Sequence, residues 1–214
     1  MPTLTTNTPE VAYLMERDWQ LRHLIEAVGD LSYEVSRSVF EHVAHSVIEQ
    51  MFSMEVGRTI EDRLRELCGG EITGEAVLSL SPEEIRSCGV AARKAATLQE
   101  LARTMPEQRL QGLAVLSDDE VHAALTAVRG IGRWTADMFL IFYLERPDFL
   151  PVEDGAVRQV FRWLYGAPLT DDNVREAVCS LWKPYSSTAV RYIYRALNMR
   201  IVDTRQAADA LLSG

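Results

Sequence analysis

The 214-residue chain is predicted to be all-α, and three observations support this class. Apolar residues recur at three- and four-residue spacing along most of the chain. A serine followed by acidic residues, the sign of a capped helix start, occurs at Ser81 and again at Ser117. No segment alternates convincingly between apolar and polar residues, and no Asn-Gly pair marks a hairpin of strands. Apolar residues make up 47% of the chain, which is enough for a buried core.

The expected helices follow one another with short connections. The first has its apolar residues on one face and stops at Gly29. The third ends at the Gly69-Gly70 pair, and Pro106 stops a later one. In chain order we expect helices over Val11–Val28, from a Ser38 cap to Met51, over Met54–Cys68, from Ser81 into EEIRSCG, over Val90–Met105, and from Ser117 to Val128.

The chain is organised around the stretch Leu125–Val160, which begins with a turn between two helices. Gly130 and Gly132, two positions apart, allow positive φ and the close approach of another backbone. The helix that begins near Trp134 leaves N–H groups at its start, and these suit an anion such as a phosphate. Taken alone, however, the turn favours an ordinary helix–helix connection ending in a glycine cap.

Charge and composition limit the classes of partner. The net charge of −9 argues against a partner held by bulk electrostatics. The basic excess lies in residues 129–200, with 10 Lys and Arg against 8 Asp and Glu, so a nucleic acid would be held by local groups. No apolar run is long enough for a bilayer, and no export signal is visible. Together with three scattered cysteines, these features predict a cytoplasmic protein without a membrane partner.

Four segments resemble a known family, in the family's own order. They are VFEHVAHSVIEQMFS, SPEEIRSCGVAARKAATLQELA, LTAVRGIGRWTADMFLIFYL with PVEDGAVRQ, and LWKPYSSTAVRYIYRAL. The family is the helix-hairpin-helix DNA glycosylase superfamily, and its DNA-3-methyladenine glycosylase II (alkyladenine) branch is the most similar. The resemblance covers about Ser38 to Asn198.

The resemblance implies one glycosylase unit, 1–214, built from two helical subdomains with the active-site cleft between them. The N-terminal helices (about 1–36) pack with the C-terminal helices (about 156–214), and the central subdomain (about 37–155) carries the hairpin at 125–140. It also implies the activity: hydrolysis of the N-glycosidic bond of alkylated bases in DNA during base-excision repair. The expected substrates are 3-methyladenine and 7-methylguanine, and further ethenoadenine, 1-methyladenine or 3-methylcytosine.

Asp154 matches the catalytic acid of the family. Cleavage of an N-glycosidic bond passes through an oxocarbenium-like transition state, which a nearby carboxylate stabilises. Glu153 competes by residue type, and Asp154 also fits a helix cap, a role compatible with catalysis. Trp134 stands where the strand-cutting members carry a Schiff-base lysine, so a monofunctional enzyme without lyase activity is expected. Only Cys179 lies near the C-terminus, which argues against the iron–sulfur loop of other branches.

The remaining site residues follow from the same resemblance. The substrate pocket is expected to contain Trp134, Tyr185, Met138 and Gly155, whereas Trp182 is expected in the core. Met51 matches the wedge that parts base steps, although helical phase alone also allows a core position. The DNA-binding residues are expected to be Gln50, Met51, Arg129, Gly130, Gly132, Arg133 and Thr135.

Partners and cofactors complete the prediction. The expected partner is double-stranded DNA with damaged bases, bound by a monomer that needs no cofactor and no catalytic metal. The hairpin carbonyls are expected to hold a monovalent ion, as in the family. His42 and His45 lack a third ligand and are interpreted as surface or minor-groove contacts. Two alternatives stay open: a non-enzymatic damaged-DNA-binding protein of the same fold, and a glycosylase for deaminated bases.

Overall fold

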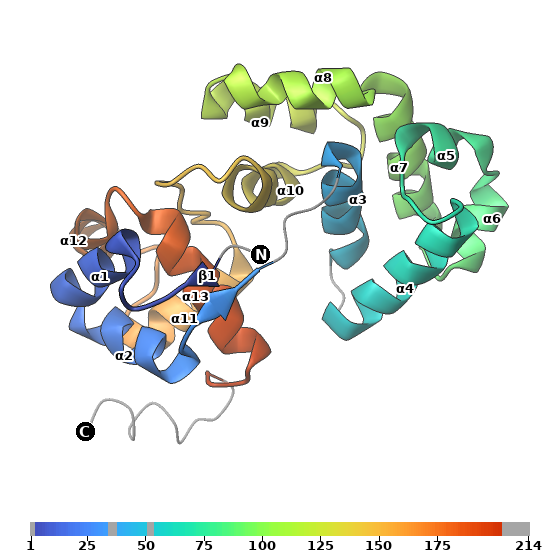
Figure 1. Ribbon diagram of the computed structural model, residues 1–214. Coiled ribbons are helices and arrows are strands. Elements are labelled where there is room, and N and C mark those ends of the chain that lie inside the picture. Colours follow the sequence, from blue (N-terminus) through green and yellow to red (C-terminus); the bar gives the residue numbers. More distant parts are fainter. Residues whose placement is uncertain (1–2, 34–37, 51–53, 203–214) are drawn as a thin grey trace. The chain divides into compact units, whose positions relative to one another are not determined.

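The predicted helical class is confirmed. The computed structural model describes residues 3–33, 38–50 and 54–202, and over these residues helices α1 to α13 follow one another (Figure 1). The exception is a two-residue antiparallel pair of strands, β1 (Thr3–Leu4) and β2 (Leu31–Ser32), in which Leu4 lies opposite Leu31. The chain divides into two compact units: unit 1 comprises residues 1–35 and 145–214, and unit 2 comprises residues 36–144.

Unit 1 contains the helices from both ends of the chain. They are α1 (Pro9–Arg17), α2 (Trp19–Val28), α11 (Gly155–Tyr165), α12 (Asp172–Trp182) and α13 (Ser186–Asn198). α13 packs against the other four helices. Residues 145–155, expected in the central subdomain, belong to unit 1, because Ser187 ties this segment to α13. The Ser187 N–H donates to the carbonyl of Pro147 at 3.1 Å, and the Phe149 N–H donates to Ser187 Oγ at 3.0 Å.

The helix expected over Val11–Val28 is two helices, because Asp18 breaks it. Asp18 has extended backbone angles, and its Oδ1 caps α2 by accepting from the Leu21 N–H at 2.9 Å. Its Oδ2 accepts hydrogen bonds from the Trp182 indole at 2.8 Å and from the Tyr165 hydroxyl. Trp182 is fully buried, as expected, and Asp18 supplies the hydrogen bond that a buried indole needs.

Unit 2 begins with α3 (Val39–Glu49) and α4 (Met54–Leu67). It continues with α5 (Gly74–Ser79), α6 (Pro82–Ser87), α7 (Ala92–Thr104), α8 (Glu107–Gln111), the 3₁₀ helix η1 (Gly112–Val115), α9 (Asp118–Thr126), α10 (Arg133–Met138) and the π-helical η2 (Phe139–Tyr143). The expected starts are confirmed: Ser81 and Ser117 form complete capping boxes, and Ser38 caps α3. α3 packs against α4, α7, α8, α10 and η2, so it is the central helix of this unit.

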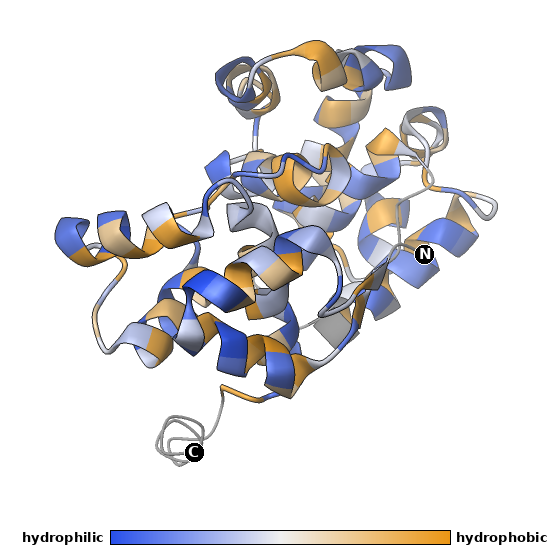
Figure 2. Ribbon diagram, turned by 60° about the vertical axis from the view of Figure 1, so that its left-hand side comes forward, coloured by the Kyte–Doolittle hydropathy of each residue, from blue (hydrophilic) through white to orange (hydrophobic). Residues whose placement is uncertain are grey.

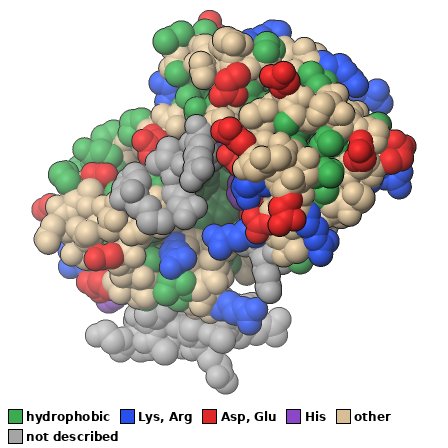
Figure 3. Space-filling view, turned by 45° about the vertical axis from the view of Figure 1, so that its right-hand side comes forward, with side chains coloured by type: hydrophobic (Ala, Val, Ile, Leu, Met, Phe, Trp, Pro, Cys, Tyr) green, Lys and Arg blue, Asp and Glu red, His purple; other side chains and the backbone are tan. Residues whose placement is uncertain are grey.

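The helices bury one side and expose the other. Figure 2 shows hydrophobic and hydrophilic stripes alternating around most of them. On the face drawn in Figure 3, basic and acidic side chains are interspersed. Within the residues that the structure describes, no helix combines the length and the apolar character needed to cross a membrane.

Candidate functional site

Asp154 is a buried carboxylate at the start of α11. It is the N-cap residue, and its Oδ1 accepts from the Val157 N–H at 2.7 Å, which confirms the expected cap. Only 5% of Asp154 is exposed. The helix start therefore binds one carboxylate oxygen and fixes the side chain relative to the backbone of α11.

The second oxygen of Asp154 is bound by a residue that sequence reasoning missed. The hydroxyl of Tyr194, on α13, donates to Asp154 Oδ2 at 2.7 Å across 40 positions of sequence. Helical periodicity does place Tyr194 on one face of α13 with Arg191 and Ser187, three and seven residues earlier in the chain. That spacing indicates a shared face, but it does not indicate which residue the face meets.

Glu153, the competing acid, points elsewhere. Its side chain is 66% exposed and pairs with the guanidinium of Arg158 at 2.7 Å. Arg158 also donates through Nε to the carbonyl of Val152 at 2.8 Å, so the pair lies along the outside of the turn. Of these two neighbouring acids, Asp154 is the one that the fold buries and orients.

Tyr185 lines a cavity of about 280 Å³ within unit 1. It is the N-cap residue of α13, and its ring meets that of Tyr13 edge to face, with centroids 5.2 Å apart. The Tyr13 hydroxyl in turn donates to the carbonyl of Lys183 at 2.6 Å. The hydrogen bond holds Tyr13 in place, and Tyr13 in turn packs against the Tyr185 ring at the start of α13.

A buried arginine lies on the wall of the same cavity. Arg191 is 6% exposed, and its guanidinium lies over the ring of Tyr33, 4.2 Å from the centroid. The carboxylate of Glu145 is 3.8 Å from Arg191 and accepts a hydrogen bond from the Tyr33 hydroxyl at 3.1 Å. Burial lowers the pKa of Arg191 and raises the pKa of Tyr33. None of these three residues was among the predicted site residues.

In unit 2, the two hairpin glycines have different roles. Gly130 has φ +96°, and a Cβ there would lie 2.0 Å from Thr97 Oγ1, so only glycine fits. Gly132 has φ −101°, and a Cβ there would meet nothing within 4 Å. Ile131 between them is buried, while Arg129 and Arg133 are exposed on either side. Gly132 therefore faces space that another molecule can enter.

The buried Thr135 and the partly exposed Gln50 form a hydrogen-bonded pair. Thr135, on α10, has 0% exposure, and its Oγ1 accepts from Gln50 Nε2 at 2.7 Å. The Lys94 ammonium donates to the carbonyls of Ile48 and Gln50, at 2.8 and 2.6 Å, and so closes the end of α3. Thr135 thus holds Gln50 in place and presents no hydroxyl to solvent. Met51, the expected wedge, lies outside the described residues.

The expected pocket residues divide between the units. Trp134 and Met138 lie four residues apart on α10, so they share one side of the helix, Trp134 partly exposed and Met138 5% exposed. Gly155 is exposed at the start of α11 in unit 1. Near α10, His122 Nε2 lies 3.0 Å from the buried Asp137 Oδ1, a pair that sequence reasoning missed. Burial and the charge of Arg133 lower the pKa of His122.

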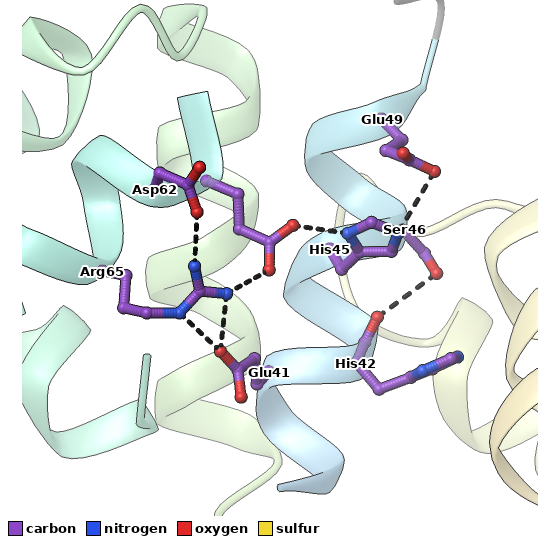
Figure 4. A network of polar contacts seen from close by, with 8 residues as sticks. Glu41, His42, His45, Ser46, Glu49, Asp62 and Arg65 are labelled. Carbon is purple, nitrogen blue, oxygen red and sulfur yellow. Dashed lines mark hydrogen bonds and ion pairs between the residues drawn. The ribbon is translucent and has the colours of Figure 1, made fainter. Parts of the chain in front are cut away.

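The interpretation of His42 as a surface or minor-groove contact is wrong, because the residue is buried, whereas the side chain of His45 is 34% exposed. His42 is 8% exposed and packs against the ring of Tyr143, with centroids 5.3 Å apart. His45 lies between two carboxylates: its Nδ1 is 2.5 Å from Glu61 and its Nε2 is 3.2 Å from Glu49 (Figure 4). Burial opposes its charge, but the hydrogen bonds and charges of Glu49 and Glu61 outweigh burial and raise the pKa of His45 to about 10.

Arg65 extends this cluster along α4. Its guanidinium binds Glu61 at 2.6 Å, Glu41 at 3.0 Å and Asp62 at 2.7 Å. We call the set Glu41, His45, Glu49, Glu61, Asp62 and Arg65 the α3–α4 ion network. It joins the two helices on either side of residues 51–53 and is a structural element of unit 2.

The expectation about metals stays a prediction. Among the described residues, no group of three or more His, Cys, Asp or Glu is arranged to hold an ion. The monovalent ion implied at the hairpin would use backbone carbonyls, an oxygen ligand that such cations accept, so the donor type fits. Two carbonyls there, of Val128 and Gly132, already accept backbone hydrogen bonds.

Known proteins are similar to this chain in sequence and in fold. A family model described as HhH-GPD superfamily base excision DNA repair protein matches residues 44–184. DNA-3-methyladenine glycosylase 1 of Schizosaccharomyces pombe is 28% identical over 210 residues, which is 90% of this chain and 88% of that protein.

Two solved structures are similar over nearly the whole chain. A crystal structure of DNA-3-methyladenine glycosidase from Bacillus halodurans superposes with a TM-score of 0.79 at 28% identity, covering 100% of both chains. The 3-methyladenine DNA glycosylase of S. pombe in complex with abasic DNA superposes with a TM-score of 0.79 at 26% identity, covering 92% of this chain and 100% of that one.

Proposed function

Since this chain belongs to the HhH-GPD superfamily of base excision DNA repair proteins, we propose that it is a monofunctional DNA glycosylase for alkylated bases. The substrates would be 3-methyladenine and 7-methylguanine, with ethenoadenine, 1-methyladenine and 3-methylcytosine as further candidates. Its similarity to proteins named 3-methyladenine DNA glycosylases supports this choice of substrates.

The observation that carries the proposal is that Asp154 is buried and hydrogen-bonded at both carboxylate oxygens. Departure of the base leaves positive charge on the sugar, and a fixed carboxylate beside the sugar stabilises that charge. Asp154 is 5% exposed, and two donors on two elements hold its two oxygens. A carboxylate prepared in this way needs little rearrangement when the charge develops, and it can also orient the attacking water.

Water is the proposed acceptor of the sugar. An amine nucleophile would form a Schiff base and lead to strand cleavage, but the corresponding hairpin position here is Trp134. The indole cannot act as that nucleophile, so the product would be an intact strand with an abasic site. No cofactor is required for this hydrolysis.

The hairpin of unit 2 is the proposed DNA-binding element. Gly132 leaves open space at the turn, and the exposed Arg129 and Arg133 flank it. Phosphate groups can approach the backbone there and meet two positive charges. Gln50, held by Thr135, and Met51 would fill the space of the flipped nucleotide.

The extruded base would stack on electron-rich rings. Trp134 and Tyr185 are the proposed aromatic walls, with Met138 and Gly155 setting the width of the pocket. Alkylation leaves a purine short of electrons, so it is attracted to such rings as a cation is. The protein would act on double-stranded DNA as a monomer in the cytoplasm.

The test is release of free base from DNA that contains one alkylated base, with Asp154→Asn beside the wild type. Asn keeps the shape and the cap but lacks the charge, so single-turnover excision of 7-methylguanine should fall by about 10³-fold or more. Glu153→Gln is the matched control and should excise at the wild-type rate.

Three outcomes would contradict the proposal or a part of it. Excision by Asp154→Asn at the wild-type rate would remove the carboxylate from the mechanism. Damage-selective binding in a filter assay, with no free base from any alkylated duplex, would favour the non-enzymatic DNA-binding alternative. A cut strand in the product would contradict the monofunctional assignment.

A further inference from the structure

We infer that Tyr194 is a positioning residue for the proposed catalytic carboxylate. This inference rests on the proposed function, because it concerns how Asp154 is held for the reaction. The observation behind it is one hydrogen bond, from the Tyr194 hydroxyl to Asp154 Oδ2 at 2.7 Å. Hydrogen bonds to a charged acceptor are about twice as strong as those between neutral groups.

The two donors on Asp154 act on different oxygens. Val157 N–H binds Oδ1, and Tyr194 binds Oδ2. A carboxylate held at one oxygen can still turn about its last torsion angle, because terminal torsions of this type are soft. With both oxygens held, the plane of the carboxylate is defined, and the remaining lone pairs keep a fixed direction. The hydrogen bond from the Val157 N–H fixes the position of Asp154 Oδ1, and the one from Tyr194 fixes the orientation of the carboxylate.

The helix that carries Tyr194 is attached to the segment before Asp154 at a second place. At the start of α13, Ser187 binds the backbone of Pro147 and Phe149, and the Ser186 hydroxyl donates to Asp148 Oδ1 at 2.5 Å. Two turns further along, Tyr194 binds Asp154 itself. α13 therefore supports both ends of the turn that precedes and contains Asp154, and Tyr185 is its N-cap residue.

Loss of the hydroxyl should affect the chemical step and not the binding of DNA. The hydroxyl is directed at Asp154, so Tyr194→Phe removes no group expected to touch the substrate. The buried carboxylate keeps its charge and its cap but loses its orientation, and errors of this kind slow the chemical step. We expect single-turnover excision of 7-methylguanine to fall about ten- to hundredfold.

The experiment compares Tyr194→Phe with Tyr192→Phe. Tyr192 is on the same helix and fully buried, and its hydroxyl makes only a 3.5 Å contact to the carbonyl of Leu4. Each variant loses one hydrogen-bonded phenolic hydroxyl from α13. Tyr194→Phe should lower the maximal excision rate with the half-saturating enzyme concentration unchanged, and Tyr192→Phe should leave the rate within about twofold. Equal excision rates for the two variants overturn the inference.

A double-mutant cycle in urea unfolding separates this inference from the proposed function. If the hydroxyl binds the carboxylate, Tyr194→Phe should lower the unfolding midpoint in the wild-type background and much less in the Asp154→Asn background. Tyr192→Phe should lower it equally in both. A wild type that releases no base, with this coupling present, overturns the proposed function while the contact stands. Additive effects of Tyr194→Phe overturn the contact whatever the activity.

Discussion

At the scale of single residues, chemically similar residues have different structural roles because their surroundings differ. Asp154 and Glu153 are neighbouring acids, yet one is buried with two donors and the other is paired on the surface. Gly130 and Gly132 are neighbouring glycines, yet only Gly130 has positive φ and a side chain against its Cα. The two members of each pair are chemically similar and close in the sequence, so their different roles come from their contacts in the fold.

Gly130→Ala should destabilise the protein by about 2–4 kcal/mol, because the new Cβ meets Thr97 and the positive φ is unfavourable for alanine. Gly132→Ala is the matched control. Its Cβ enters open space at negative φ, so its stability should stay within about 0.5 kcal/mol of the wild type. Urea denaturation measures both variants. Equal midpoints for the two would show that Thr97 does not confine the turn.

Gly132→Ala should nevertheless weaken DNA binding, if the open space at Gly132 is where the DNA backbone approaches. A methyl group there would keep a phosphate away from the turn without disturbing the fold. The measurement is fluorescence anisotropy with an abasic duplex. Wild-type affinity in Gly132→Ala would exclude this part of the hairpin from the DNA interface.

At the scale of elements, the α3–α4 ion network joins the two helices that flank residues 51–53. Its central group is His45, whose pKa is raised from 6.5 to about 10 by Glu49 and Glu61. A raised pKa in the folded state gives a stabilisation that is fully present below pH 6.5 and is lost as the pH rises through about 10. The pKa of Glu61 is lowered by His45 and Arg65 against the effect of burial, so its contribution is present above 4.5 and is lost on acidification.

His45→Gln should therefore change the pH dependence of unfolding. Between pH 6 and pH 10 the wild type should lose more stability than His45→Gln, and the two curves should converge near pH 10. Denaturant titrations at a series of pH values provide the comparison. His23→Gln is a suitable control, because His23 lies on α2 in unit 1, outside the α3–α4 ion network, where it contacts Glu26 at 3.6 Å and the ring of Trp19. Parallel curves for wild type and His45→Gln would exclude a protonated His45.

At the scale of the whole molecule, the net charge of −9 has the same sign as the DNA backbone that the proposed function requires the protein to bind. An acidic protein has no long-range attraction to DNA. Its affinity for DNA therefore has to come from a few local cations and backbone donors. The exposed Arg129 and Arg133 at the hairpin are the cations that the proposal assigns to this task.

Arg129→Gln and Arg133→Gln should each lower the slope of log K against log salt by about 1, the effect of one lost phosphate contact. The weakening should be similar for damaged and undamaged duplexes, because phosphate contacts carry no sequence information. Arg86→Gln, an exposed substitution on α6, should leave the slope unchanged. An unchanged slope in both hairpin variants would remove the hairpin arginines from the interface.

Local features of this protein were determined by its sequence alone. The all-α class and the caps at Ser38, Ser81, Ser117 and Asp154 could be predicted, because a cap and a helical face depend on residues three or four positions apart. The break at Asp18 was missed because the apolar periodicity continues across it, although its cap on the Leu21 N–H is local. The partners of its second oxygen, Trp182 and Tyr165, lie more than 140 positions away and could not be predicted.

Only the tertiary structure decided which distant residues complete the site. The contacts of Tyr194 with Asp154, of Thr97 with Gly130 and of Glu61 with His45 join residues far apart along the chain, and such contacts leave no periodic pattern in the sequence. For the same reason His42, which packs against Tyr143, was misread as a surface residue. Sequence could identify the carboxylate and its cap, but the second donor that orients it exists only once α13 packs against α11.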